Sequence, residues 1–157
     1  KTITFFYIHI IFYMKKSIYS INEMHNAIKQ IVKQINISGF NPEVIVSINR
    51  GGCIPGVYLS HFLDKPHKMI DIKLADSSEN KFSFLKKNKL ILIIDDINDT
   101  GRTFNFVKKT FNDSDSEIRF AALINNVTSK TKIDYHGQLI DKSENPVWYV
   151  FPWENWW

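Results

Sequence analysis

The chain of 157 residues contains a single cysteine, Cys53, so an intrachain disulfide is excluded. This composition is typical of a reducing compartment, and we expect a cytoplasmic protein. A membrane-spanning helix requires about 20 apolar residues, and the apolar stretch over residues 2–13 is shorter than that. This stretch also lacks the basic start and the small-residue cleavage site of a signal peptide. We therefore expect no membrane partner.

Internal repeats and low-complexity linkers are absent as well, and the five histidines show no metal-ligand spacing. The net charge is +4, but the lysines are scattered, which predicts a solvated surface and no nucleic-acid partner. The length suits one domain with its own core, which we place at residues 14–157. Residues 1–13 are either a translated leader that precedes Met14 or an extra strand.

Helical and extended patterns alternate along the chain. Ser20 and Glu23 have the spacing of a capping box, apolar residues then recur at helical spacing, and Gly39 ends the helix. The expected helices cover residues 21–38, 55–63 and 103–111, and the expected strands cover residues 43–49, 68–74, 89–94 and 118–125. Residues 75–88 and 125–146 are polar or aperiodic, so we expect connections there. The pattern predicts an α/β fold, a doubly wound and mostly parallel sheet flanked by helices.

The stretch LILIIDDINDTGRTF, residues 90–104, places Asp95 and Asp96 at the end of an apolar strand. Buried carboxylates need partners, because desolvation of an unpaired charge is costly. Adjacent strand residues point to opposite faces, so we expect these acids to share a ligand only where the end of the strand frays. A sugar diol or a hydrated Mg²⁺ ion suits such a pair.

The next residues form a turn before a helix. Gly101 permits a positive φ, Thr100 and Thr103 supply hydroxyl groups, and the helix start offers unpaired N–H groups. These features predict a phosphate site, although the spacing is not that of a Walker loop. A phosphate, a diol and a magnesium ion held within about 10 Å describe a ribose 5-phosphate.

Residues 90–104 resemble the phosphoribosyl-pyrophosphate motif of the type I phosphoribosyltransferases: an apolar strand, two acids, two variable residues and D-T-G-x-T. Residues 41–63, NPEVIVSINRGGCIPGVYLSHFL, resemble the pyrophosphate-loop region of that family. Residues 147–154, VWYVFPWE, resemble the C-terminal segment of its xanthine/hypoxanthine-guanine branch. The similarity covers roughly residues 17–154, and it implies a small hood formed with the C-terminal segment.

The resemblance implies a role for each matching position in binding phosphoribosyl pyrophosphate and Mg²⁺. Asp95 and Asp96 would hold the ribose hydroxyls and the metal. The 5-phosphate would be bound by Thr100, Gly101, Arg102 and Thr103. Arg50 and Gly51 would contact the pyrophosphate, next to a peptide bond, here Asn49–Arg50, that is often cis in the family. Residues 75–88 would close over the site.

The resemblance also implies a purine acceptor. Asp99 would lie near the purine N7 as general base, Trp148 would stack on the ring, and the Tyr149 backbone would read the exocyclic group. The branch usually has a lysine that donates to the purine O6, and this chain has Asn126 there. Asn126 can donate but is neutral; Lys130 or Lys132 would be substitutes.

Three functions remain open. The first is phosphoribosyl transfer to a 6-oxopurine (hypoxanthine, guanine or xanthine) by a homo-oligomeric enzyme of purine salvage. The second is a regulator of the same fold that senses a nucleotide or phosphoribosyl pyrophosphate without turnover, which the neutral residue Asn126 favours. The third is an enzyme for another acceptor, such as adenine or a pyrimidine.

Overall fold

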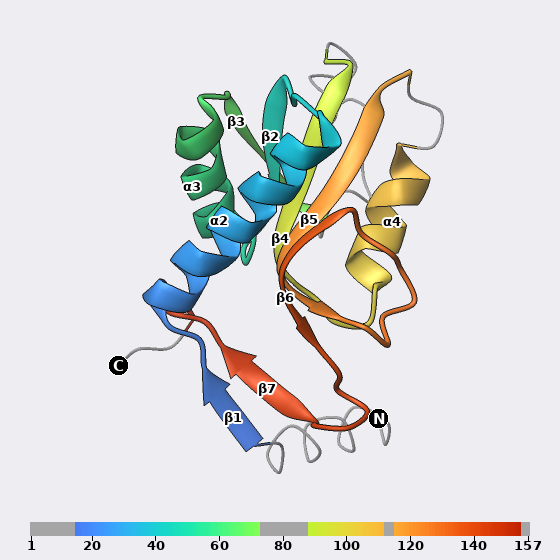
Figure 1. Ribbon diagram of the computed structural model, residues 1–157. Helices are drawn as coiled ribbons and strands as arrows, with labels where there is room; N and C mark the ends of the chain where they lie inside the picture. Colours follow the sequence, from blue (N-terminus) through green and yellow to red (C-terminus); the bar gives the residue numbers. More distant parts are fainter. Residues whose placement is uncertain (1–14, 73–87, 112–114, 155–157) are drawn as a thin grey trace.

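A computed structural model describes residues 15–72, 88–111 and 115–154 (Figure 1). A five-stranded sheet forms its centre, in the order β3-β2-β4-β5-β6, and every strand pair in this sheet is parallel. These strands are β2 (Val44–Ile48), β3 (His67–Ile70), β4 (Leu90–Asn98), β5 (Glu117–Asn126) and β6 (Tyr135–Ile140). The prediction of a mostly parallel α/β sheet is therefore confirmed.

Helices cover both faces of the sheet. The helices α2 (Ile21–Ser38) and α3 (Cys53–Leu63) lie on one face, and α4 (Arg102–Thr110) lies on the other (Figure 1). Strand β4 lies at the centre of the sheet, and its apolar run is buried on both faces. Its residues Leu92 and Ile94 pack toward α2, whereas Ile91 and Ile93 pack toward α4. All four side chains are inaccessible to solvent, as expected for a strand buried on both faces.

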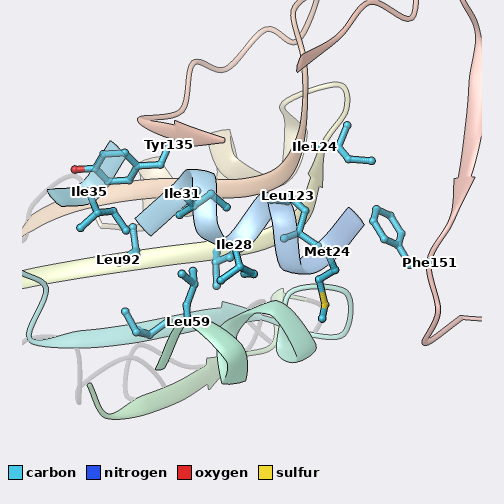
Figure 2. Packing of buried hydrophobic residues seen from close by; sticks show 14 of the residues in the cluster. Met24, Ile28, Ile31, Ile35, Leu59, Leu92, Leu123, Ile124, Tyr135 and Phe151 are labelled. Carbon is cyan, nitrogen blue, oxygen red and sulfur yellow. The ribbon is translucent and has the colours of Figure 1, made fainter. Parts of the chain in front are cut away.

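The apolar stripe of α2 holds this helix on the sheet. Met24, Ile28, Ile31 and Ile35 recur at helical spacing and are buried. Figure 2 shows these side chains among those of β4 and β5, including Leu92 and Leu123. Full burial of such a side chain contributes about 1.5–3 kcal/mol, so this stripe dominates the attachment of the helix.

The predicted capping box is present at the start of α2. The Ser20 hydroxyl accepts a hydrogen bond from the Glu23 N–H over 3.2 Å, and the Glu23 carboxylate accepts one from the Ser20 N–H over 2.6 Å. We expect Ser20→Ala to lower the free energy of unfolding by about 1 kcal/mol, measured by urea denaturation. Ser20→Thr keeps the hydroxyl and should stay near the wild type. Equal stability of the alanine variant and the wild type would show that the cap contributes nothing.

A second, two-stranded sheet forms the hood. Strand β1 (Lys15–Ile18) pairs in parallel with β7 (Val147–Val150), at the opposite end of the described chain. Tyr19 and Phe151 follow these strands, lie 5.1 Å apart between ring centroids, and belong to the α2-side core. The hood is therefore part of the same folded unit. Strand β1 was not predicted, because its pairing partner lies far away in the sequence.

Two element predictions were wrong. Strand β4 does not end at residue 94 but continues to Asn98, because β5 pairs with it that far. The acids Asp95 and Asp96 therefore lie inside a strand and not at a frayed end. The predicted connection over residues 125–146 contains β6, an edge strand of mostly half-exposed residues that shows no clear alternation. Residues 1–13 and residues 75–87 of the expected closing loop lie outside the described residues.

Candidate active site at the carboxyl ends of the strands

The predicted site residues gather where the parallel strands end. A cavity of about 800 Å³ lies there, bounded by segments that follow β2 and β3, by β4, by the start of α4 and by the hood. Its lining residues are Ile48, Asn49, Arg50, Gly51, Asp71, Ile72, Asp95, Asp96, Thr103, Trp153 and Glu154. Ligands of parallel sheets bind at this edge.

Asp95 and Asp96 both line this cavity although they are adjacent in a continuous strand. The cavity reaches both faces of the sheet, since Thr103 contributes from the α4 side and Trp153 from the hood. Both side chains can therefore reach the same cavity although the strand does not fray. A Cβ atom at Gly51 would overlap the Asp96 carboxylate in its present position, so a larger residue there would require this side chain to move.

Burial disfavours the charged form of both acids. It raises the pKa of Asp95 well above its ordinary value, and the neighbouring Asp96 charge adds to this effect. Burial also raises the pKa of Asp96 to about 6, with a further contribution from Glu154, while a 2.7 Å hydrogen bond from the Ile97 N–H opposes the rise. Neither carboxylate forms an ion pair with a described residue, although Arg50 lines the same cavity. The Trp153 side chain lines the same cavity and acts to lower the pKa of Asp96, although its buried Nε1 makes no hydrogen bond of ordinary geometry with a described residue.

The turn after β4 forms a second, smaller cavity of about 210 Å³. It is lined by the continuous stretch from Asp95 to Phe104, which includes Asp99, Thr100, Gly101, Arg102 and Thr103. Gly101 has a φ of 83° and caps the start of α4. The first N–H groups of this helix have no partner within the helix and carry its positive dipole end, which suits an anion.

A polar network that the sequence reasoning missed supports this turn. The Thr131 hydroxyl donates to the Gly101 carbonyl over 2.8 Å, and the Asn98 amide donates to the Thr131 carbonyl over 2.8 Å. Asn98 also bonds to the side chains of Asn125 and Ser129. Asn98 is 1% exposed, so these bonds satisfy a buried polar group. A polar residue inside the apolar β4 pattern was the available signal.

A third group of residues surrounds Asp99. Nζ of Lys142 lies 2.8 Å from Oδ2 of Asp99, and Nδ2 of Asn126 lies 3.2 Å from the Asp99 carbonyl oxygen. The same ammonium lies 6.0 Å from the centroid of the Trp148 ring, which is 37% exposed. Lys130 and Lys132 have exposed side chains. The lysine at Asp99 is therefore Lys142, which the sequence reasoning did not name.

The side chain of Tyr149 packs against the core on the α2 side of the sheet. Its ring meets the Tyr19 ring edge-on, with centroids 6.4 Å apart. The peptide bond between Asn49 and Arg50 is cis.

Within residues 15–72, 88–111 and 115–154, no three His, Cys, Asp or Glu side chains converge to hold a metal ion. No described helix has both the length and the apolar character needed to cross a membrane.

Comparisons with known proteins show what the chain resembles in sequence and in fold. Residues 14–155 match the model of the phosphoribosyl transferase domain. A purine phosphoribosyltransferase from Pyrococcus horikoshii Ot3 is similar with a TM-score of 0.71 and 29% identity, over 91% of this chain and 97% of that one.

Two further solved structures share the fold at lower identity. One is a hypothetical protein from Neisseria gonorrhoeae with bound ppGpp, with a TM-score of 0.73 and 20% identity over 90% of each chain. The other is a Helicobacter pylori xanthine-guanine-hypoxanthine phosphoribosyltransferase, with a TM-score of 0.66 and 24% identity over 88% of this chain and 93% of that one. No curated protein sequence matches.

Proposed function

Because the chain belongs to the phosphoribosyl transferase family, we propose that it transfers the 5-phosphoribosyl group of phosphoribosyl pyrophosphate to a 6-oxopurine. The acceptor would be hypoxanthine, guanine or xanthine, and the products would be a nucleoside 5′-monophosphate and pyrophosphate. One observation carries the proposal: Asp95 and Asp96 line both the cavity beside Arg50 and the cavity at the Gly101 turn. Two acids flanked by an anion-binding turn suit the diol and the phosphate of a ribose 5-phosphate.

The two cavities would hold opposite ends of the activated sugar. In the smaller one, backbone N–H groups and hydroxyls would bind the 5-phosphate; the residues are Thr100, Gly101, Arg102 and Thr103. In the larger one, the Arg50 guanidinium and the Gly51 backbone would bind the pyrophosphate. This division supports the proposal because both anionic groups of the sugar would then meet positively polarised donors.

The acids also suit a magnesium ion. Mg²⁺ in proteins is commonly bound by one or two carboxylates and takes its remaining oxygens from water and substrate phosphates. Asp95 and Asp96 provide two carboxylates, and burial raises the pKa of each. A nearby cation would stabilise their charged forms. A bound ion would neutralise charge on the leaving pyrophosphate. The two acids would at the same time accept hydrogen bonds from the ribose hydroxyls.

Asp99 would accept the proton that the base loses. In the proposed reaction, the bond from the anomeric carbon to a pyrophosphate oxygen breaks while a bond to a purine nitrogen forms. The proton that the purine loses would pass to the Asp99 carboxylate. Trp148 would stack on the base, and Asn126 and the Tyr149 backbone would lie near its exocyclic group. The protein would accelerate the reaction mainly by position and electrostatics.

A base panel tests the proposal. The protein would be mixed with phosphoribosyl pyrophosphate, Mg²⁺ and one of hypoxanthine, guanine, xanthine, adenine or uracil. We expect pyrophosphate and a nucleoside monophosphate to appear in equal amounts with at least one oxopurine, and neither to appear when the base or Mg²⁺ is omitted. Product formation only with adenine or uracil would support the other-acceptor enzyme. No product with any base would refute transfer.

The regulator without turnover is the second candidate, and Asn126 favours it. A neutral side chain in place of the usual lysine would stabilise developing negative charge at the purine O6 less well. The Neisseria gonorrhoeae protein of this fold holds ppGpp. Calorimetry would then detect binding of phosphoribosyl pyrophosphate or a guanine nucleotide without product, and a gel-shift at stated salt would test for bound RNA or DNA.

A further inference from the structure

We propose that Lys142, in the turn after β6, supplies the cation that recognises the exocyclic oxygen of the base. The inference rests on the proposed function and deepens it, because it assigns the substrate class to purines with a carbonyl oxygen at the 6-position. It starts from an absence in β5, whose last residue, Asn126, is neutral. Any positive donor for the base would therefore come from elsewhere in the fold.

Asn126 is already engaged by the protein. Its Nδ2 donates to the carbonyl oxygen of Asp99 over 3.2 Å and approaches the Asp99 carboxylate at 3.4 Å. Its Oδ1 accepts from the N–H and hydroxyl of Thr128 and from the N–H of Lys142. Both ends of the amide are thus occupied. Asn126 is a positioning residue that holds Asp99 and Lys142 side by side.

The strand register places Lys142 beside the position that lacks a lysine. Asn126 of β5 pairs with Ile140 of β6, so the turn after β6 begins next to the end of β5. The Asp141 carboxylate accepts hydrogen bonds from the N–H and the hydroxyl of Ser143, which stabilises this turn. A cation can therefore reach the same corner of the site from the neighbouring strand.

The surroundings of the Lys142 ammonium suit a base-binding role. The side chain is only 13% exposed, lies 2.8 Å from one carboxylate oxygen of Asp99, and is 6.0 Å from the Trp148 ring centroid. An ammonium has three N–H donors. One is directed at Asp99, and within the described residues Nζ makes no other hydrogen bond. The remaining donors are available to an acceptor on a purine stacked against Trp148.

This arrangement discriminates by the chemistry of the exocyclic group. A carbonyl oxygen at the 6-position accepts a hydrogen bond from the ammonium, whereas an amino group at that position does not. A site that hydrogen-bonds a substrate strongly rejects the analogue that leaves its buried polar group unpaired. Asp99 remains paired with the same ammonium, so one lysine would orient the proton acceptor and select the base.

Equilibrium binding of nucleotides tests the role of Lys142 without requiring turnover. We expect the wild type to bind guanosine 5′-monophosphate more tightly than adenosine 5′-monophosphate by about 10- to 100-fold, as a charge-assisted hydrogen bond provides. In Lys142→Met this preference should fall below about threefold, within the scatter expected without that bond. Affinity for phosphoribosyl pyrophosphate with Mg²⁺, measured by calorimetry, should stay unchanged.

Matched variants separate the possible results. Lys132→Met removes an exposed lysine and should retain the guanine preference. Lys142→Gln keeps a neutral donor, and its preference should be intermediate; thermal denaturation establishes that each variant is folded. Retention of the full preference by folded Lys142→Met or Lys142→Gln overturns the proposal, as does equal binding of the two nucleotides by the wild type. Failure of the base panel with an intact, Lys142-dependent guanine preference would instead refute catalysis alone.

Discussion

Replacement of Asp95 and Asp96 together by asparagine is expected to lower turnover by about a thousandfold and, above pH 7, to increase the stability of the protein. Burial raises the pKa of both acids, which means that the folded protein disfavours their charged forms. Asparagine has nearly the same shape and no charge to desolvate. The double variant should therefore be more stable but less active. This result is common at functional sites, where groups that are needed for activity also lower the stability of the folded protein.

The pH dependence of this gain follows from the raised pKa of Asp96. Because its pKa is raised, Asp96 binds a proton more tightly in the folded protein than in the unfolded chain. The stability gained in this way is fully present below pH 3.8, the ordinary pKa of the group, and is lost as the pH rises through about 6. At about 1.4 kcal/mol for each pKa unit, the rise corresponds to at most about 3 kcal/mol. The difference between variant and wild type should therefore be small near pH 4 and reach about 2–3 kcal/mol above pH 7.

Urea denaturation at several pH values, with a chelator present, measures this difference. Turnover should fall by about a thousandfold, since preorganised charge at the reacting group is lost. Asp115→Asn removes an exposed carboxylate as a control, and its stability should stay within about 0.5 kcal/mol of the wild type. A double variant that is less stable than the wild type at pH 8, or whose turnover stays near that of the wild type, would contradict the assignment of these acids.

Gly101→Ala should destabilise the protein and weaken binding of phosphoribosyl pyrophosphate. Gly101 has a φ of 83°, and an added Cβ atom would lie 2.6 Å from the Thr131 backbone nitrogen. Strain of the left-handed backbone and overlap with a neighbouring segment therefore act together. We expect a loss of about 3 kcal/mol, the upper range for one strained residue, and a shift of the turn away from its anion-binding shape.

Gly39→Ala is the matched control, because Gly39 also has a positive φ, 68°, but an added Cβ atom would meet nothing within 4 Å. It should lose about 1 kcal/mol from backbone strain alone and bind phosphoribosyl pyrophosphate as the wild type does. For Gly101→Ala we expect affinity about 100-fold lower, as when a phosphate-binding backbone is displaced. Equal stability losses and unchanged affinity in both variants would show that Thr131 does not confine the turn.

The phosphate turn and the paired acids could be recognised in advance because they lie in one short segment. Within residues 90–104, the strand, the acids, the Gly101 turn and the helix start are consecutive, so local rules suffice to relate them. The same locality explains the correct capping box at Ser20. The extent of β4 beyond residue 94 was not predictable, since it depends on pairing with β5, which is formed by a distant segment.

The Asp99 cluster shows where local reasoning stops. Asp99 and Lys142 are separated by 43 positions, and their ion pair exists because β6 pairs with the end of β5. Strand β6 is a half-exposed edge strand, so its sequence carries little periodic signal. A search for the missing lysine near Asn126 therefore pointed to Lys130 and Lys132, which are adjacent in sequence but have exposed side chains.

The sequence by itself determined the family, the parallel sheet and the segment that would bind a phosphorylated sugar, because hydrophobic period, turn chemistry and one contiguous motif are local properties. The tertiary structure alone decided that Asp95 and Asp96 share one cavity, that Thr131 supports Gly101, and that Lys142 stands at Asp99. Each of these arrangements depends on segments that are far apart in the chain. Their distances depend on strand register and helix packing, which are set by burial of the whole core.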